Sequence, residues 1–323
     1  MISVTRSHRY WPVLFNLMPT LTAANPQLEL SQEFQQVTRA AMEKWRVPGI
    51  AVGVLRNGEI SWQLGMGRLH RDDPNAVKTS SVFEAASLGN VFLAYLVWTL
   101  ANHARLELDR PMAHYMPLPA GSNNMAKQIT ARHVLTHTSG LANTLDETTP
   151  LAPVRIPGTF WQYSGRAFLH LQRVVEHLTQ TRLQTLMDEA VFTSLGMTHS
   201  HFCDKAAFDK VSATGHDARG EPMKKQQPHN ADTVASLHTN IADMARFLLA
   251  LVGSERRDTL DRTFLQIMLR PQVAIAAEHG LHWANGVGIE RAFGSEYFFH
   301  VDANPYFSSL IMGSLTERSG IVV

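Results

Sequence analysis

Cysteine is nearly absent from this chain, which has one, Cys203, in 323 residues. A single cysteine allows no intrachain disulfide, and no Cys-x-x-Cys or Cys/His pattern with the spacing of a zinc site occurs. These absences exclude dithiol redox proteins, disulfide-stabilised scaffolds and structural zinc domains.

An excess of charge of one sign is also lacking. Lys and Arg total 29 against 28 Asp and Glu, and the formal net charge is +1. Proteins that bind nucleic acid by neutralising phosphates carry basic patches, so we expect no nucleic-acid partner. The 45% hydrophobic and 18% charged residues are typical of a globular protein, and the length allows about two structural units.

Hydrophobic runs long enough to cross a bilayer are missing. The run 91–101 has about half of the roughly 20 residues that a membrane-spanning helix needs, so it predicts a buried helix and no transmembrane segment. Residues 1–24 loosely follow the basic, apolar, small-residue order of a secretory signal. Residues 1–27 are therefore either a signal or an N-terminal extension. The protein is periplasmic or secreted in the first case and cytoplasmic in the second.

Three catalytic motifs are absent as well. The chain has no His-Glu-x-x-His, no Gly-x-Ser-x-Gly and no Gly-x-x-x-x-Gly-Lys sequence. His133 and His137 have the i, i+4 spacing of a metal pair, but Val-Leu-Thr separates them and no glutamate is present. We therefore expect no catalytic metal, no α/β-hydrolase nucleophile and no phosphate-binding loop.

The apolar pattern changes period along the chain. Residues 28–45 carry apolar side chains three and four positions apart, which predicts an amphipathic helix. The runs 50–55 and 60–64 flank Asn57-Gly58, a strong signal for a β-hairpin. Further helices are expected near 87–102, 129–135, 167–179, 183–193 and 245–251, the last capped near Thr239 or Asn240, and further strands at 286–292, 297–301, 307–313 and 321–323.

Strands at both ends of the chain enclose a helical middle. We predict an α+β fold, in which an antiparallel sheet is built from both chain ends and flanked by helices, with a mostly helical domain inserted. The expected boundaries are 28–79 plus 232–323 for the sheet domain and 80–231 for the helical domain. An active site is expected where the two domains meet.

Ser87 is a candidate nucleophile because it directly precedes the long apolar helix. Backbone N–H groups at a helix start favour a nearby oxyanion, and position i+3 lies one turn further along the same face. In a Ser-x-x-Lys site that position holds a lysine which assists the serine, but here it is Asn90. An amide orients a hydroxyl but neither accepts a proton near neutral pH nor supplies a positive charge.

The chain resembles the serine β-lactamase and penicillin-binding protein superfamily, in particular its class C-like branch. That branch also contains esterases and peptidases that release D-amino acids. The resemblance covers about residues 30–323 and rests on four motifs in order. They are Val47-Pro-Gly-Ile-Ala-Val, Leu106-Glu-Leu-Asp with Pro111 and Tyr115-Met-Pro, Val134-Leu-Thr-His-Thr-Ser-Gly-Leu141, and Phe192 with Leu195-Gly-Met-Thr198.

The resemblance implies that Ser87 is the nucleophile and that Tyr163 exchanges protons with the serine and the leaving group. Tyr163 lies in 157–165, which resembles the Tyr-x-Asn loop of the family. A phenol has an ordinary pKa of about 10 and acts as a base only when a cation lowers that pKa. Asn90 removes the most direct such cation, and Gly165 replaces the substrate-binding asparagine of many members.

The segment 299–305 resembles the family's strand that reads Lys or His, any residue, then Gly. The resemblance implies that His300 holds an acidic substrate group or tunes Tyr163, and that the backbone N–H groups of Ala303 and Ser87 form the oxyanion hole. Asp302 replaces the glycine and adds bulk and negative charge. We therefore expect a perturbed oxyanion hole and poor binding of anionic β-lactams.

Taken with the motifs, the resemblance implies a serine hydrolase of esterase, β-lactamase or D-amino-acid peptidase type. It would act through an acyl-enzyme on Ser87 and be impaired by the three departures at residues 90, 165 and 302. Its substrates would be small esters, amides or peptide-like molecules, with no cofactor. The alternative is a catalytically inactive binding or regulatory protein that keeps the fold, and the oligomeric state stays open.

Overall fold

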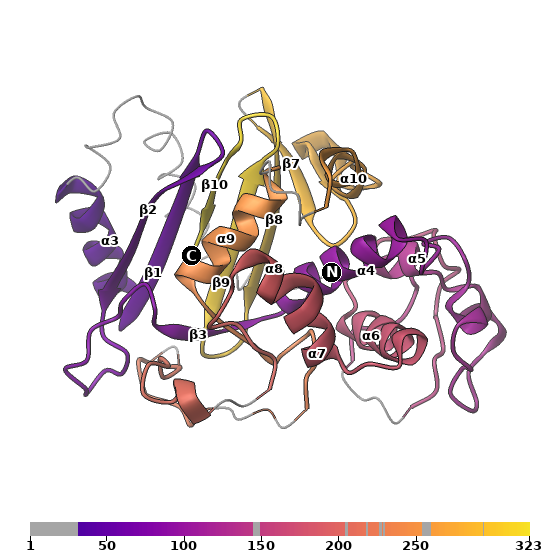
Figure 1. The fold of residues 1–323 in the computed structure, drawn as a ribbon, viewed down its shortest axis with the longest axis horizontal. Helices are drawn as coiled ribbons and strands as arrows, with labels where there is room; N and C mark the ends of the chain where they lie inside the picture. The colour runs from indigo at the N-terminus through magenta and orange to yellow at the C-terminus, as the bar shows by residue number, and fades with distance from the viewer. Residues whose placement is uncertain are drawn as a thin grey trace.

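The main feature of the fold is an eight-stranded antiparallel sheet with the order β2-β1-β10-β9-β8-β7-β6-β5 (Figure 1). The computed structural model describes residues 32–144, 149–203, 206–217, 219–225, 228, 230–253, 260–292 and 294–323. The strands are β1 (Gly49–Arg56), β2 (Glu59–Gly67), β5 (Val273–Ala276), β6 (Leu281–Trp283), β7 (Gly288–Ala292), β8 (Ser295–Ala303), β9 (Ser308–Ser314) and β10 (Ser319–Val322).

The two ends of the chain meet in the middle of this sheet. Strand β1 pairs with β10, with Gly53 opposite Val322, and β1 also pairs with β2. The β1–β2 turn has Asn57 at φ 50° and Gly58 at φ 77°, the left-handed conformation that Asn-Gly turns of hairpins adopt. The predicted hairpin and the prediction of an antiparallel sheet built from both chain ends are thus confirmed.

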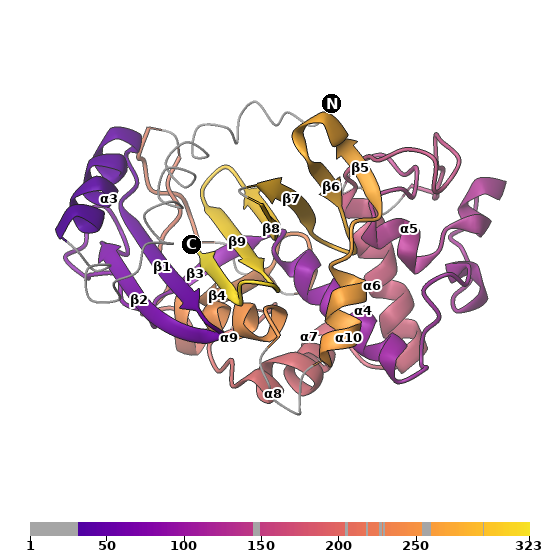
Figure 2. The same cartoon turned by 90° about the horizontal axis from the view of Figure 1, so that it is seen from above.

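Alternating side chains give the sheet two apolar faces. On one face Val52, Trp62 and Tyr297 form a cluster with Phe34 of helix α3 (Gln32–Trp45), whose ring meets Trp62 edge-on at 5.2 Å. On the other face Gly53 lies against Ala245 of helix α9 (Ile241–Leu251). Helices α3 and α9 therefore cover opposite faces (Figure 2). The predicted first helix is confirmed for 32–45, and residues 28–31 lie outside the described residues.

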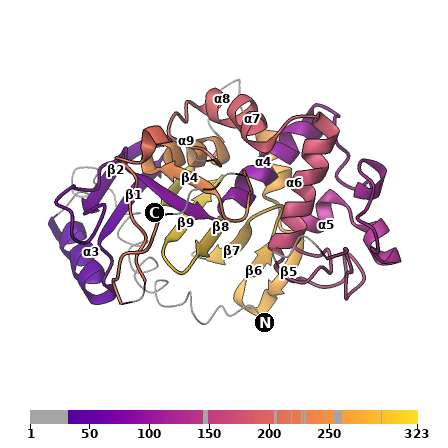
Figure 3. The ribbon, with the colours of Figure 1, turned by 90° about the horizontal axis from the view of Figure 1, so that it is seen from below.

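The helices of the chain's middle gather at the β5–β6 side of the sheet (Figure 3). The helix predicted for 183–193 is not continuous. The π-turn Asp188–Phe192 separates α7 (Leu183–Met187) from α8 (Thr193–Leu195). The last predicted helix is capped by Asn240, whose side chain accepts a 2.8 Å hydrogen bond from the backbone N–H of Asp243. The helices are α4 (Gly89–Asn102), α5 (Ala131–Leu135), α6 (Gly165–Thr179), α7 (Leu183–Met187), the π-turn Asp188–Phe192, α8 (Thr193–Leu195) and α10 (Arg262–Met268).

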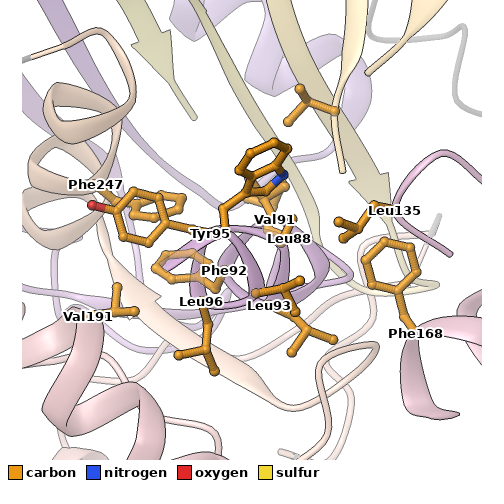
Figure 4. Close-up of a cluster of buried hydrophobic side chains, with 14 of the residues drawn as sticks. Leu88, Val91, Phe92, Leu93, Tyr95, Leu96, Leu135, Phe168, Val191 and Phe247 are labelled. Atoms are coloured by element: carbon orange, nitrogen blue, oxygen red, sulfur yellow. The ribbon is translucent and has the colours of Figure 1, made fainter. Parts of the chain in front are cut away.

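Helix α4 is apolar on all sides and forms the centre of the core, as the sequence predicts. Its side chains point outward around the whole helix (Figure 4). Phe92 stacks on Phe247 of α9 with ring centroids 3.8 Å apart. A helix buried on every side is held rigidly, because each of its side chains is fixed by neighbours. Among the helices that the structure describes, none has the length and apolarity that a bilayer crossing needs.

A second, two-stranded sheet leads into α4. It consists of β3 (Val82–Ala86) and β4 (Leu237–Asn240), which pair antiparallel. The sequence analysis did not predict these strands, nor β5, β6 and α10, because they are short and their apolar residues show no clear alternation. Strand β3 is the element that delivers Ser87 to the start of α4.

Candidate active site

Ser87 lies in the sharp turn between β3 and α4. Ala86 precedes it at φ 46°, a left-handed conformation that costs a non-glycine residue about 1 kcal/mol or more. Helix α4 begins at Gly89, and the backbone N–H of Asn90 donates to the Ser87 carbonyl at 3.0 Å. Ser87 therefore stands just before the helix, slightly earlier than the predicted first turn, and it is only 7% exposed.

Asn90 contacts Tyr163, as expected for residues of one site. The Asn90 side-chain amide donates a 3.0 Å hydrogen bond to the Tyr163 hydroxyl. Asn90 is fully buried, and its Oδ1 has no hydrogen-bond partner among the described residues. The Ser87 side chain also interacts with the Tyr163 hydroxyl and lowers the pKa of that hydroxyl. The fold thus brings three residues together that are up to 76 positions apart in the chain.

The hydroxyl proton of Ser87 is directed away from Tyr163. The Ser87 hydroxyl donates a 2.9 Å hydrogen bond to the backbone carbonyl of Val234. A serine hydroxyl has a single proton, so this proton is not shared with Tyr163 in the resting structure. This direction is opposite to the one in which a tyrosine takes the serine proton.

Val234 belongs to a tight loop that is held in place by side chains. Asp232 Oδ1 accepts hydrogen bonds from the backbone N–H groups of Val234 (2.9 Å) and Ala235 (2.6 Å). Gln172 of α6 accepts from the N–H of Thr233 and donates to the carbonyl of Ala231. These bonds explain why the Val234 carbonyl is fixed against Ser87.

Gly89 allows this loop to approach the helix. A Cβ at Gly89 would lie 2.3 Å from the carbonyl oxygen of Thr233. No side chain larger than a hydrogen fits without moving the loop. The sequence analysis missed Val234, Asp232 and Gln172. A turn around Asp232 was readable from its composition, but nothing in the sequence indicated that it packs against Ser87.

Asp302 contacts the backbone of Ser87, whereas Val234 contacts its hydroxyl. The backbone N–H of Ser87 donates a 2.8 Å hydrogen bond to Asp302 Oδ2. Strand β8 is placed there by its neighbour β9, because Ser309 lies opposite Asp302 and its hydroxyl donates to the Ala85 carbonyl at 3.2 Å. A carboxylate therefore lies at the N–H group that the resemblance assigns to the oxyanion hole.

The pKa of Tyr163 is raised to about 12, chiefly by burial; the Ser87 and Asn90 side chains act to lower this pKa, and the negative charge of Asp302 acts to raise it. An aqueous phenol has a pKa of about 10. Near neutral pH the Tyr163 side chain is therefore a phenol and not a phenolate.

His300 lies behind the site and is 2% exposed. Burial lowers the pKa of His300 below its usual range, whereas the charge of Asp302 and a hydrogen bond to the Gly286 backbone raise it. Its ring meets Trp283 edge-on at 5.9 Å. The imidazole is therefore mostly neutral and covered, and its binding of an acidic substrate group stays a prediction.

His137 packs against the ring of Tyr163. Its ring centroid lies 4.4 Å from that of Tyr163, and its Nδ1 accepts a hydrogen bond from the backbone N–H of Ser164 at 3.2 Å. Burial lowers the pKa of His137 well below its usual range. His133 instead caps α5, because its Nδ1 accepts from the backbone N–H of Thr130. The two histidines thus serve different parts of the structure.

The last two candidate residues are placed differently. Ala303 is exposed, follows Asp302 at the end of β8 and lies opposite Ser308. Gly165 is buried at the start of α6, where its backbone N–H donates to the Asn143 side chain at 2.9 Å. A substrate-binding role for either residue stays a prediction.

Comparison with known proteins adds to this geometry. The Beta-lactamase family model matches residues 34–323. Penicillin-binding protein 4 of Amycolatopsis lactamdurans is 27% identical over 236 residues, which is 66% of this chain and 62% of that protein. Esterase EstB of Burkholderia gladioli is 28% identical over 235 residues, which is 64% of this chain and 58% of that protein. The chain thus spans less than two thirds of the length of these relatives.

Solved structures extend the likeness to the fold. A β-lactamase/D-alanine carboxypeptidase from Pseudomonas syringae has a TM-score of 0.80 at 17% identity, covering 89% of this chain and 91% of that one. This likeness confirms the fold class that the sequence implied, in which helices accompany a large antiparallel sheet. With nearly the whole described chain matched, this protein belongs to the Beta-lactamase family of serine hydrolases, whose members include penicillin-binding proteins, esterases and class C β-lactamases.

Proposed function

We propose that this protein is a slow serine esterase that acts through an acyl-enzyme on Ser87. The observation that carries the proposal is the grouping of Ser87, Tyr163 and Asn90 at the start of the buried helix α4, where Asn90 hydrogen-bonds Tyr163 and Ser87 interacts with it. A hydroxyl just before a rigid helix, beside a phenol able to exchange protons, has the arrangement that nucleophilic catalysis requires.

In the proposed reaction the phenolate form of Tyr163 takes the proton from the Ser87 hydroxyl. Ser87 Oγ forms a bond with the acyl carbon, and the bond from that carbon to the leaving oxygen then breaks. Tyr163 returns the proton to the leaving oxygen, which departs as an alcohol. Water attacks the acyl-serine by the same route, Tyr163 taking a proton from the water and returning it to Ser87 Oγ, and releases the acid.

The raised pKa of Tyr163 supports a low rate. The pKa of Tyr163, raised to about 12 by burial, keeps the phenolate scarce near neutral pH. A well-placed acid or base contributes about 10²- to 10⁴-fold in rate, so most of this gain is missing at Tyr163. Activated esters need less assistance from a base than amides do, which favours esterase over peptidase or β-lactamase activity.

The test is intact-protein mass spectrometry after incubation with p-nitrophenyl acetate, a penicillin and a fluorophosphonate. We expect a mass increase with the ester and the fluorophosphonate that is lost in Ser87→Ala. Ser308→Ala is the matched control, because Ser308 is an exposed serine of the neighbouring strand β9, and it retains the labelling.

The second candidate function is that of a non-catalytic binding protein. The observation that favours it is the engagement of both reactive groups of Ser87, its hydroxyl by Val234 and its N–H by Asp302. Absence of labelling in the folded wild-type protein, at reagent concentrations that acylate a control esterase, overturns the esterase proposal in favour of this one.

A further inference from the structure

The negative charge of Asp302 lies where a reacting substrate would itself become negative. Its carboxylate accepts the Ser87 N–H at 2.8 Å, and this is the only hydrogen bond or ion pair of the Asp302 side chain within the described residues. When a serine attacks an acyl carbon, the carbonyl oxygen becomes an oxyanion that needs such N–H donors. Asp302 thus occupies the Ser87 N–H, and its negative charge repels the oxyanion that this N–H would stabilise.

The groups beside Asp302 do not neutralise it. Asn90 is an amide, Tyr163 is a phenol near neutral pH, and His300 is mostly neutral because burial lowers its pKa. His137, which packs against Tyr163, is neutral for the same reason. None of these four side chains therefore offsets the formal charge of −1 on Asp302.

The Asp302 side chain is free to leave while its backbone stays fixed. Ser309 and Asn304 tie the β8–β9 hairpin to β3, through the Ala85 carbonyl (3.2 Å) and the Glu84 carboxylate (3.4 Å). The Asp302 side chain is partly exposed and held by one hydrogen bond. Rotation about its own side-chain bonds is therefore enough to release the Ser87 N–H.

We propose that Asp302 makes this site selective for substrates with a protonated amine a few bonds from the scissile carbonyl, because the ammonium draws the carboxylate off the Ser87 N–H. The ammonium offers Asp302 a hydrogen bond in which donor and acceptor are both charged, whereas only the acceptor is charged in the bond from the Ser87 N–H that it gives up. A neutral substrate displaces the carboxylate without this compensation. An anionic substrate is repelled by it.

This inference names the substrate class for the proposed esterase site and rests on that proposal for the chemical step. Three acetyl thioesters separate the effects of charge and shape. They are 2-(dimethylamino)ethyl thioacetate, which is a cation at pH 7, 3-methylbutyl thioacetate, which is its neutral isostere, and 2-sulfonatoethyl thioacetate, which is an anion. Each would leave the same acetyl group on Ser87, so only the leaving group differs.

Binding is measured first, by ligand-observed NMR titration on Ser87→Ala, where no acylation occurs. We expect the cation to bind about 10-fold or more tighter than its neutral isostere, and the anion to bind weakest. The added change Asp302→Asn, which keeps the shape and an acceptor oxygen, brings the cation-to-neutral ratio to about 1. Glu59→Gln removes one exposed negative charge on the edge strand β2 and leaves the ratio unchanged.

Thiol release by the protein with Ser87 intact then gives kcat/KM for the three thioesters. We expect the same order, and we expect Asp302→Asn to abolish the preference while raising hydrolysis of the neutral thioester. Equal binding of cation and isostere, or a preference that survives Asp302→Asn, overturns the inference. A charge preference in binding without acetylation of Ser87 overturns the esterase proposal alone and supports the assignment of Asp302.

Discussion

The side-chain amide of Asn90 lies 3.0 Å from the Tyr163 hydroxyl and donates a hydrogen bond to it. Residue 90 is therefore the nearest side chain from α4 that is able to change the proton affinity of the phenol. An amide contributes no charge, and burial raises the pKa of Tyr163 to about 12. The chemistry of the site thus depends on what stands at position 90.

Asn90→Lys tests this dependence. We expect acylation of Ser87 by p-nitrophenyl acetate to accelerate about 10-fold or more, because an ammonium beside the phenol favours its phenolate form. Stopped-flow detection of the first p-nitrophenol released measures the acylation step. Asn90→Met has a similar length without charge and gives no gain. A folded Asn90→Lys protein that acylates no faster than wild type would show that residue 90 does not act through Tyr163.

The pH profile tests the role of Tyr163. Below its pKa of about 12, the phenolate fraction rises tenfold with each pH unit, so we expect the acylation rate to rise from pH 7 to 10 without a plateau. We expect Tyr163→Phe to lower the acylation rate. The rise of the rate with pH that remains in this variant is then only the rise that direct attack by hydroxide produces. Asp302→Asn removes a negative charge that raises this pKa and moves the profile to lower pH. A Tyr163-dependent plateau below pH 9 would contradict this assignment.

Gly89→Ala tests the contact between the helix start and the loop that carries Val234. The new Cβ would lie 2.3 Å from the carbonyl oxygen of Thr233, which belongs to the backbone and is not free to turn away. We expect the free energy of unfolding to fall by about 1 to 3 kcal/mol, as measured by urea denaturation. Asn102→Ala, at the exposed end of the same helix, is the control, with a change of about 0.5 kcal/mol or less. Equal stability of the two variants would mean that the loop yields freely.

Three buried histidines predict sensitivity to acid. Burial lowers the pKa of His137, His170 and His300, in the case of His170 to about 4. The folded state keeps these rings neutral while the unfolded state binds protons below about pH 6.5, so their contribution to stability is complete above that pH and is lost as the pH falls. For His170, whose pKa in the folded state is about 4, we expect a loss of about 1 kcal/mol per pH unit between pH 6.5 and 4.5. The lowered pKa values of His137 and His300 add to this loss.

Urea denaturation at pH 7.5, 6.5 and 5.5 measures this slope. His170→Gln removes one of the three groups, and we expect it to reduce the slope by about 1 kcal/mol per pH unit below pH 6.5. A free energy of unfolding that stays constant from pH 7.5 to 5.5 would show that these rings take up protons in the folded protein.

The long periodic elements could be predicted from the sequence. Helix α4 follows from its unbroken apolar run, α3 from its spacing of three and four, and the β1–β2 hairpin from Asn57-Gly58. The short strands β3 to β6 could not be predicted in this way. Each has three to five residues, so its conformation is decided by its pairing partner and not by its own side chains.

The residues of the candidate site also divide into those that the sequence predicts and those that it does not. Ser87, Tyr163 and Asp302 could be proposed as site residues because each lies in a motif whose residue types are readable along the chain. The Val234 carbonyl could not be predicted in this way. Every residue has a backbone carbonyl, and only the fold decides which carbonyl lies beside the Ser87 hydroxyl. The sequence also supplied the identity of Asp302 but not its position against the Ser87 N–H.

The sequence alone determined which chemical groups this protein has: a serine before a buried helix, an amide one turn later, a tyrosine, and an aspartate near the end of the chain. Tertiary structure decided how they face one another. The hydrogen bonds of Asn90 with Tyr163, of the Ser87 hydroxyl with Val234 and of the Ser87 N–H with Asp302 depend on distances of about 3 Å between segments up to 215 positions apart. Such distances are set by the packing of α4, β8 and the 231–236 loop, because hydrogen bonds act only at short range.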